Sequence, residues 1–154
     1  MRARRLLIPA ILAALAGCTV SSAQPDLWGQ DVRLTVFHTA DIHSRLLPYD
    51  ITIDTTDRNL GMSPEAYPYG GAARIRALYQ REKAKADRSV LLDSGDCFEG
   101  APIFNNNNGE PEFRFMSLLH PDASVVGNHE FDHGALNFAY QAKAWVNYPL
   151  LVAN

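Results

Sequence analysis

The chain has 154 residues, of which 47% are hydrophobic and 20% are charged, and its formal net charge at pH 7 is -3. This hydrophobic fraction excludes a chain that is disordered by composition, and the length allows one small domain. The excess of acidic residues disfavours a nucleic-acid polymer as a partner, because such polymers are bound by basic surfaces.

The first 17 residues have the organisation of a secretory signal peptide. An apolar stretch from Leu6 to Ala16 follows Arg2, Arg4 and Arg5 and is too short to span a bilayer. We therefore predict an exported protein of the periplasm or cell envelope. Removing residues 1–17 takes away three of the 14 basic residues and none of the 17 acidic ones, so 11 minus 17 leaves -6 on the remainder.

The end of this leader resembles a bacterial lipobox. The residues Leu15-Ala16-Gly17-Cys18 would make Cys18 the lipidated first residue of the mature protein, anchored to a membrane without spanning it. The alternative is an ordinary signal peptide cleaved after Ala23. With Cys18 as the first mature residue, residues 18–30 would form a tether. Because Cys97 is the only other cysteine, lipidation of Cys18 leaves no internal disulfide.

Strand and helix patterns alternate through residues 31–154. A strand is predicted from about Arg33 to Thr39, followed by a long, proline-containing loop from Leu46 to Tyr69 that lacks a clear period. Gly70-Gly71 opens a predicted helix that runs to about Ala86. The apolar stripe of this helix, expected to face the core, consists of Ile75, Leu78 and Tyr79.

The second half repeats the alternation. A predicted strand from Ser89 to Asp93 precedes an asparagine-rich segment from Pro102 to Gly109, which is expected to be a loop. Pro111 suits the first turn of a helix that ends near Leu119, with Phe113 and Met116 facing inward. The remaining elements are a strand from Ala123 to Val126, a helix from Leu136 to Val146 and a strand from Pro149 to Val152. This alternation predicts an α/β fold with a parallel sheet and right-handed crossovers.

Three of the apolar strands stop at different polar signatures. The signatures are Asp41-Ile42-His43, Gly95-Asp96 and Gly127-Asn128-His129-Glu130. The carboxyl ends of parallel strands meet at one edge of a sheet, and ligands gather outside those ends. We therefore predict that the three signatures converge.

These residue types suit a site for divalent cations, which accept carboxylate, imidazole and amide oxygen donors. On an extended segment, Asp41 and His43 would point to the same face and reach one metal. Gly95 permits a sharp turn that frees the Asp96 carboxylate to lie between two cations, and Asn128 offers a neutral oxygen. Taken singly, each residue is better explained as a cap or a packed side chain. Their joint occurrence at three strand ends favours a metal site.

Several neighbouring residues are expected to have structural roles. We expect Glu130 to support the site or the fold, Cys97 to fill space and His38 to pack within the sheet. Arg74 is expected to be structural rather than phosphate-binding, and Gly127 to meet a requirement of the backbone.

Four short sequence motifs follow one another along the chain. They are Phe37-His38-Thr39-Ala40-Asp41-Ile42-His43-Ser44-Arg45, Gly70-Gly71-Ala72-Ala73-Arg74, Asp93-Ser94-Gly95-Asp96 and Gly127-Asn128-His129-Glu130-Phe131-Asp132. Together they resemble the calcineurin-like metallophosphoesterases, and more closely their periplasmic 5'-nucleotidase branch. The resemblance runs from about Leu34 to Asn154. It implies a layered α/β metallophosphoesterase domain, truncated after about four strands, of which residues 31–154 are the N-terminal part.

The resemblance implies two divalent metal ions, which could be Zn, Mn, Mg or Ca. Asp41 and His43 match ligands of the first metal, Asp96 matches the carboxylate that bridges both, and Asn128 matches a ligand of the second. His129 matches the catalytic histidine. Asp132 matches the carboxylate that orients it, which it can reach if a helical turn starts there.

The family pattern also calls for metal-binding histidines further along and for a C-terminal domain that forms the nucleoside pocket. Neither occurs before Asn154, and none of the five histidines of the chain is a substitute. We therefore expect the front part of a longer enzyme. On its own it should be marginally stable, because a raw edge of the parallel sheet would expose backbone donors and apolar side chains. Its hydrolytic activity should be weak or absent.

The function implied by the resemblance is that of an exported, metal-dependent phosphoric ester hydrolase, in which an activated water attacks a nucleotide phosphate. The substrate could be a nucleoside 5'-phosphate, a 2',3'-cyclic nucleotide, a nucleotide sugar or another phosphate ester, and the related thiosulfate-cleaving branch is a further alternative. A different class stays open, namely a non-catalytic, truncated lipoprotein with a partial metal site.

Overall fold

The computed structural model describes residues 26–63 and 68–152. The predicted signal peptide and Cys18 lie outside these residues, as does most of the predicted tether. The chain divides into two units, Met1–Val32 and Arg33–Asn154. In the described part of the first unit the backbone makes one turn, with the Gln30 N–H donating to the Leu27 carbonyl at 3.1 Å. Among the helices described in either unit, none combines the length and the apolar character that crossing a membrane requires.

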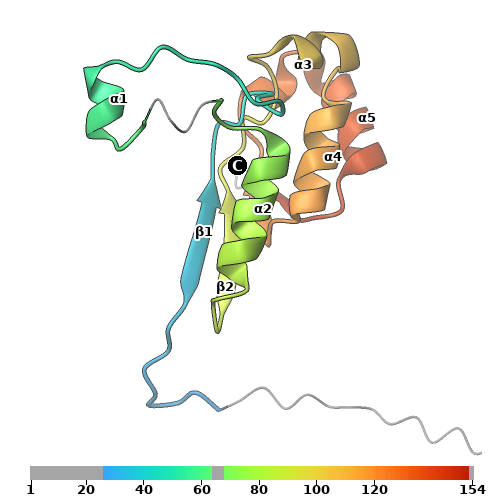
Figure 1. Cartoon of the computed structure of the whole chain (residues 1–154). Coiled ribbons are helices and arrows are strands. Elements are labelled where there is room, and N and C mark those ends of the chain that lie inside the picture. Colours follow the sequence, from blue (N-terminus) through green and yellow to red (C-terminus); the bar gives the residue numbers. More distant parts are fainter. Residues whose placement is uncertain (1–25, 64–67, 153–154) are drawn as a thin grey trace, which may run out of the picture. The chain divides into compact units, whose positions relative to one another are not determined.

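A parallel sheet organises the second unit (Figure 1). Its strands are β1 (Thr35–Thr39), β2 (Ser89–Asp93), β3 (Ala123–Val125) and β4 (Leu150–Leu151). They lie in the order β1-β2-β3-β4, and every neighbouring pair is parallel. The predicted α/β class and all four predicted strands are therefore confirmed. The register aligns Thr39, Asp93 and Ser124 across three strands, so the carboxyl ends of these strands lie together.

Within residues 26–63 and 68–152, six helical segments connect or follow the strands. They are α1 (Thr55–Asn59), α2 (Ala72–Lys83), α3 (Pro102–Asn107), α4 (Glu110–Leu119), the 3-10 turn η2 (His129–Phe131) and α5 (Gly134–Trp145). The structure confirms the predicted helices at α2, α4 and α5, and it shows Pro111 in the first turn of α4. Helix α4 packs against both α3 and α5.

Two segments predicted to be loops contain helices, so these predictions were wrong. Within the long loop, the Asp54 side chain accepts a hydrogen bond from the Asp57 N–H, and the Asp57 side chain accepts one from the Asp54 N–H. This capping box is enough to start the single short helix α1. The asparagine-rich segment forms α3 because Pro102 suits a first turn and Phe104, which is fully buried, anchors the helix in the core.

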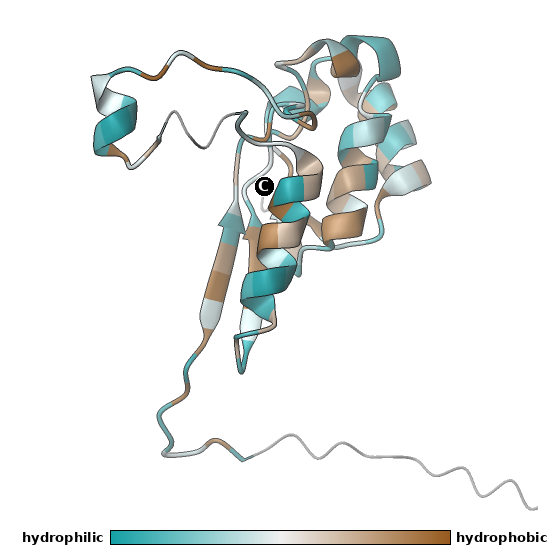
Figure 2. Ribbon diagram, viewed as in Figure 1, coloured by the Kyte–Doolittle hydropathy of each residue, from teal (hydrophilic) through white to brown (hydrophobic). Residues whose placement is uncertain are grey.

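The core lies between one face of the sheet and the helices. The Phe98 ring is at its centre, with ring centroids 5.2 Å from Phe104 and 4.6 Å from Phe113. Met116 is also buried, so the inward orientation predicted for Phe113 and Met116 is confirmed. Figure 2 shows the corresponding apolar bands on α4 and on β1 and β2.

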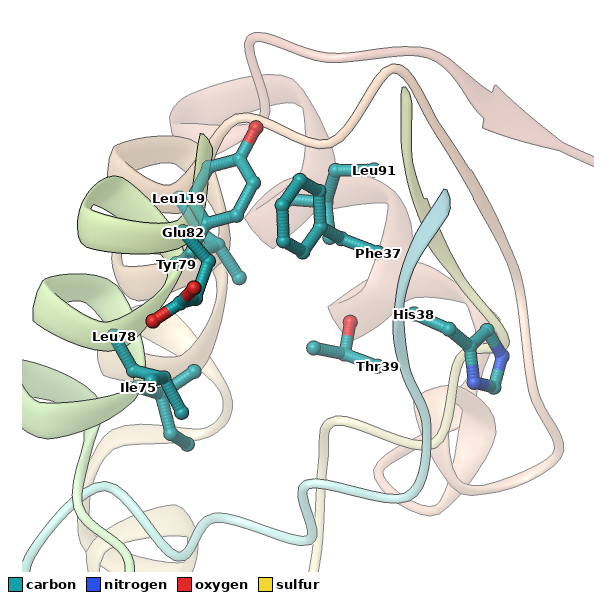
Figure 3. A pocket seen from close by; sticks show the side chains of 9 residues that line it. All are labelled: Phe37, His38, Thr39, Ile75, Leu78, Tyr79, Glu82, Leu91 and Leu119. Atoms are coloured by element: carbon teal, nitrogen blue, oxygen red, sulfur yellow. The ribbon is translucent and has the colours of Figure 1, made fainter. Parts of the chain in front are cut away.

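Helix α2 covers the sheet less completely than its apolar stripe predicted. Ile75 and Tyr79 are partly buried, and the Tyr79 ring meets Phe37 of β1 edge-on at 5.1 Å. Leu78 is 52% exposed, so its assignment to the core was wrong. A cavity of about 230 Å³ remains between this helix and the strands (Figure 3).

The opposite face of the sheet exposes apolar side chains. The exposed residues are Val36, Leu92, Val125 and Leu151, with exposed fractions of 56, 39, 42 and 51%. His38 lies on the other side of β1 from Phe37 (Figure 3), is exposed, and bonds through Nε2 to the Ser94 hydroxyl at 2.7 Å. The expectation that His38 packs within the sheet was therefore wrong. These apolar residues lie on a face of the sheet, whereas exposure was predicted at its raw edge. That expectation and the expected marginal stability both stay predictions.

The packing of Phe98 generates the first test. Gly109 has a φ of +101°, and a Cβ there would lie 2.2 Å from Phe98 Cζ, whereas Gly134 has a φ of +84° and open space around it. Gly109→Ala and Gly134→Ala should therefore share a backbone strain of about 1–2 kcal/mol. Only Gly109→Ala should add a packing penalty of about 1–3 kcal/mol, measured as the free energy of unfolding in urea. Equal losses in the two variants would contradict the close contact between Gly109 and Phe98.

Candidate metal centre

The loop that follows β1 carries the first two candidate ligands. Asp41 and His43 have φ values of +50° and +47°, in the left-handed region, so the expected extended geometry was wrong. The left-handed residues curl the chain instead. The two side chains still meet, with His43 Nε2 3.7 Å from Asp41 Oδ1.

Backbone pairing continues past the ends of β1 and β2. The Asp41 N–H donates to the Gly95 carbonyl at 3.1 Å, and the His43 N–H donates to the Asp96 carbonyl at the same distance. The Ser44 N–H donates to the Cys97 carbonyl at 2.9 Å. These bonds hold the loop bearing Asp41 and His43 against the loop bearing Asp96.

A close approach of two glycines holds the third loop in place. A Cβ on Gly95 would lie 2.6 Å from the Gly127 nitrogen, and a Cβ on Gly127 would lie 2.1 Å from Asp96 Oδ1. The His129 N–H donates to the same Asp96 oxygen at 2.9 Å. A side chain at position 127 would clash with the Asp96 carboxylate, so glycine is needed there. This clash is the physical reason for the backbone role predicted for Gly127.

Three candidate residues converge on one point. Among the described residues, His43, Asp96 and His129 each offer a ligand atom, and these atoms lie within 4.8 Å of one another. The His43 and His129 rings meet edge-on, with centroids 4.9 Å apart. One carboxylate and two imidazoles at this spacing fit a divalent cation. Asp41 lies beside His43 and keeps 66% of its side chain exposed.

Hydrogen bonding prepares His43 for this role. Its Nδ1 lies 3.2 Å from the Phe98 carbonyl, which can only accept a hydrogen bond. Nδ1 therefore carries the proton, and the lone pair of Nε2 is available to a cation.

Asn128 lies in the same loop, directly before His129. Asn128 is exposed, and its backbone carbonyl accepts a hydrogen bond from the Phe131 N–H at 3.1 Å. The structure thus brings Asn128 to the edge of the site, while its role as a ligand stays a prediction.

The turn η2 pairs His129 with Asp132. His129 Nδ1 lies 2.7 Å from Asp132 Oδ2, across the helical spacing of three residues. This hydrogen bond raises the pKa of His129 above its ordinary value, partly opposed by desolvation and reinforced by the charges of Asp132 and Asp96. The Nε2 edge of His129 is turned away from this partner and is available for a proton donor or ligand role.

Two buried carboxylates lie beneath the candidate ligands. Asp93, only 5% exposed, accepts hydrogen bonds from the Thr39 hydroxyl at 2.7 Å, the Ser124 hydroxyl at 2.6 Å and the Gly95 N–H at 3.1 Å. Glu130 is 2% exposed and accepts bonds from four backbone N–H groups of the loops after β2 and β3. Sequence reasoning gave Glu130 a supporting role but missed Asp93, whose only signal was an acidic residue at the end of an apolar strand.

Cys97 and Arg74 have contacts that match their expected structural roles. Cys97 is 4% exposed, and burial raises the pKa of its thiol, so the side chain stays neutral. Arg74 donates through Nη1 to the Pro68 carbonyl.

The apolar cavity beside α2 is separate from these ligands. Its lining consists of Phe37, His38, Thr39, Ile75, Leu78, Tyr79, Glu82, Leu91 and Leu119 (Figure 3). It contains none of the predicted metal ligands, so the polar cluster at the strand ends is the stronger candidate for a functional site.

Known proteins resemble this chain over most of its length. The model of the calcineurin-like phosphoesterase family matches residues 34–153. A 5'-nucleotidase of Vibrio cholerae is 33% identical to this chain, over 98% of this chain and 25% of the relative. The snake venom 5'-nucleotidase of Crotalus adamanteus is 36% identical, over 79% of this chain and 19% of the relative. The crystal structure of a 5'-nucleotidase precursor from Thermus thermophilus superposes with a TM-score of 0.66 at 37% identity, covering 79% of this chain and 22% of that protein. The chain thus spans about a quarter or less of the length of these relatives.

The pairing of His129 with Asp132 generates a prediction about pH. Asp132→Asn should lower the pKa of His129, because the charged partner that raises it is removed. Titration of the histidine Cε1 protons by NMR, in metal-free protein, measures this shift. Asp87→Asn, a change of an exposed carboxylate just before the amino end of β2, should leave the pKa of His129 unchanged.

The same pair links pH to stability. A histidine whose pKa is raised by folding stabilises the fold below its unfolded pKa, about 6.5, and this contribution is lost as the pH rises through the folded value. Asp132→Asn should therefore reduce the free energy of unfolding more near pH 6 than near pH 9. An equal reduction at both pH values would contradict the charged pair.

Proposed function

The chain belongs to the calcineurin-like phosphoesterase family, and we propose that it forms part of an exported, metal-dependent hydrolase that cleaves a phosphoric ester of a nucleotide. The observation that carries this proposal is the convergence of His43, Asp96 and His129 at the strand ends. The 5'-nucleotidase relatives support nucleotides as the substrate class.

The donors present fit a centre for two divalent cations. Asp41 and His43 would hold the first, Asp96 would bridge both, and Asn128 would contribute to the second. The carboxylates of Asp41 and Asp96 supply negative charge, and His43 presents Nε2 because its Nδ1 faces a carbonyl. Such a pair of cations supplies a nucleophile from water at neutral pH and offsets charge on the phosphoryl oxygens.

His129 is proposed to act on the substrate itself. Asp132 holds Nδ1 of His129, which leaves Nε2 free for the substrate, and the ring lies beside Asp96 and His43. Since Asp132 also favours the protonated imidazole, Nε2 can donate a hydrogen bond to a phosphoryl oxygen or a proton to the leaving oxygen. Asp132 orients the ring and does not need to lose its own charge.

Metal content and hydrolysis test these assignments together. Phosphate release from AMP and from a chromogenic phosphodiester should be followed with added Mn²⁺ or Zn²⁺, and bound metal determined after dialysis. Asp96→Ala should lose both metals, because the shared ligand is gone. His129→Ala should keep the metals and, in any form of the protein that turns over, lower the rate by about 10²–10⁴-fold.

The outcomes separate the roles. Equal metal content in the wild type and Asp96→Ala would contradict the bridging assignment, and loss of metal in His129→Ala would make His129 a ligand. Asp87→Asn serves as the control, since it removes a carboxylate outside the site. No phosphate release with at most one weakly held metal is the result expected of an incomplete enzyme. Two tightly held metals without any phosphate release would favour a non-catalytic, metal-binding protein.

Export and lipid anchoring are the second part of the proposal, supported by the basic and apolar leader and by Cys18. Cys18→Ser should abolish incorporation of labelled palmitate in a bacterial host and move the protein from the membrane to the soluble fraction. Cys97→Ser, a change at a buried thiol, is the matched control and should keep the label. Release of an unlabelled wild-type protein would favour an ordinary signal peptide.

A further inference from the structure

Glu130 joins the loops that carry the candidate ligands. Its Oε2 accepts hydrogen bonds from the Asp96 N–H at 3.0 Å and from the Gly127 N–H at 2.6 Å. Its Oε1 accepts from the Cys97 N–H at 2.8 Å and the Phe98 N–H at 3.3 Å. One side chain thus ties the loop after β2 to the loop after β3.

We propose that Glu130 is a positioning residue of the metal centre, whose carboxylate sets the placement of Asp96 relative to His129. This inference rests on the proposed function. A carboxylate that is 2% exposed is stable only with strong partners, and four N–H groups supply them. The His129 N–H donates to Asp96 Oδ1 in the same network, so a displaced Glu130 would move both Asp96 and His129.

The Phe98 carbonyl extends the effect to His43, another candidate ligand. Glu130 holds the Phe98 N–H, and the carbonyl of the same residue receives Nδ1 of His43 at 3.2 Å. The orientation of His43, and the availability of its Nε2, therefore depends on a residue that Glu130 fixes.

Replacement by glutamine breaks this arrangement selectively. An amide has one oxygen and one NH₂ group, so it can satisfy only one pair of N–H donors and must face the other pair with its own hydrogens. Either Asp96 and Gly127, or Cys97 and Phe98, would lose their acceptor in Glu130→Gln. Size is conserved, so the change isolates hydrogen bonding from packing.

Glu112 provides the matched control. This residue of α4 is fully buried, and burial raises the pKa of its carboxyl, an effect that the Ser44 hydroxyl partly offsets. Within the described residues, its carboxylate makes no hydrogen bond to the loops of Asp96 or His129. Glu112→Gln therefore removes an ionisable group from the same core while leaving the four hydrogen bonds to Glu130 in place.

The test uses Co²⁺ as the probe, with the full chain. Co²⁺ titrations followed by visible absorption give affinity and band shape, and urea unfolding gives stability. Glu130→Gln should weaken Co²⁺ binding by about 10- to 100-fold and change the band shape, which reports the geometry of the ligands. Glu112→Gln should preserve the wild-type affinity and band shape.

Each outcome decides a separate point. Wild-type affinity and band shape in Glu130→Gln would overturn the positioning role and leave the proposed metal centre standing. Absence of Co²⁺ binding in the wild type would overturn both. A loss of stability alone, with an unchanged spectrum, would reduce Glu130 to a residue of the fold and so overturn the inference.

A measurement on the wild type covers the case in which Glu130→Gln does not fold. The amides of Asp96, Cys97, Phe98 and Gly127 should exchange slowly with solvent, and saturating Zn²⁺ should slow all four further, because metal and network stabilise one another. Zn²⁺ that binds without slowing these amides would overturn the inference.

Discussion

The architecture of the candidate site depends on backbone N–H groups that converge on a buried carboxylate. The loops after β2 and β3 leave the sheet at neighbouring points, and nothing in a parallel ladder fixes how they continue. Glu130 supplies that constraint by accepting four hydrogen bonds from the two loops. Asp93, at the end of β2, accepts hydrogen bonds from the hydroxyls of Thr39 and Ser124 and so links β1, β2 and β3. Two buried acids thus hold the strand ends and loops that carry the candidate ligands.

Left-handed backbone conformations are the second constraint. Asp41, His43 and Asp96 all have positive φ, which is unfavourable for residues other than glycine and persists only where surrounding contacts hold it. Here the contacts are the hydrogen bonds between the loops after β1 and β2 and the close packing of Gly95 against Gly127. The local strain and the polar side chains therefore occur at the same place, where the strands end.

Much of the fold could be predicted from periodicity, because buried strands and amphipathic helices leave repeating patterns. The short helices α1 and α3 could not, since α1 depends on the capping pair Asp54 and Asp57 and α3 on the burial of Phe104. The convergence of the three motifs followed from the parallel order of the strands. The geometry of the site could not be predicted in this way. Asp41 and His43 lie close together because their backbone is left-handed, and not extended as predicted.

The sequence by itself determined the α/β class, the family and the identity of the candidate ligands. Strand patterns and the motifs that follow them consist of residues close together in the chain, so they can be recognised without the structure. Tertiary structure decided which atoms these residues present to one another. The partner of His43 Nδ1 is a carbonyl 55 residues away, and Glu130 binds amides more than 30 residues earlier in the chain. Contacts of this kind depend on how loops from separate strands pack against each other, and no local pattern records that packing.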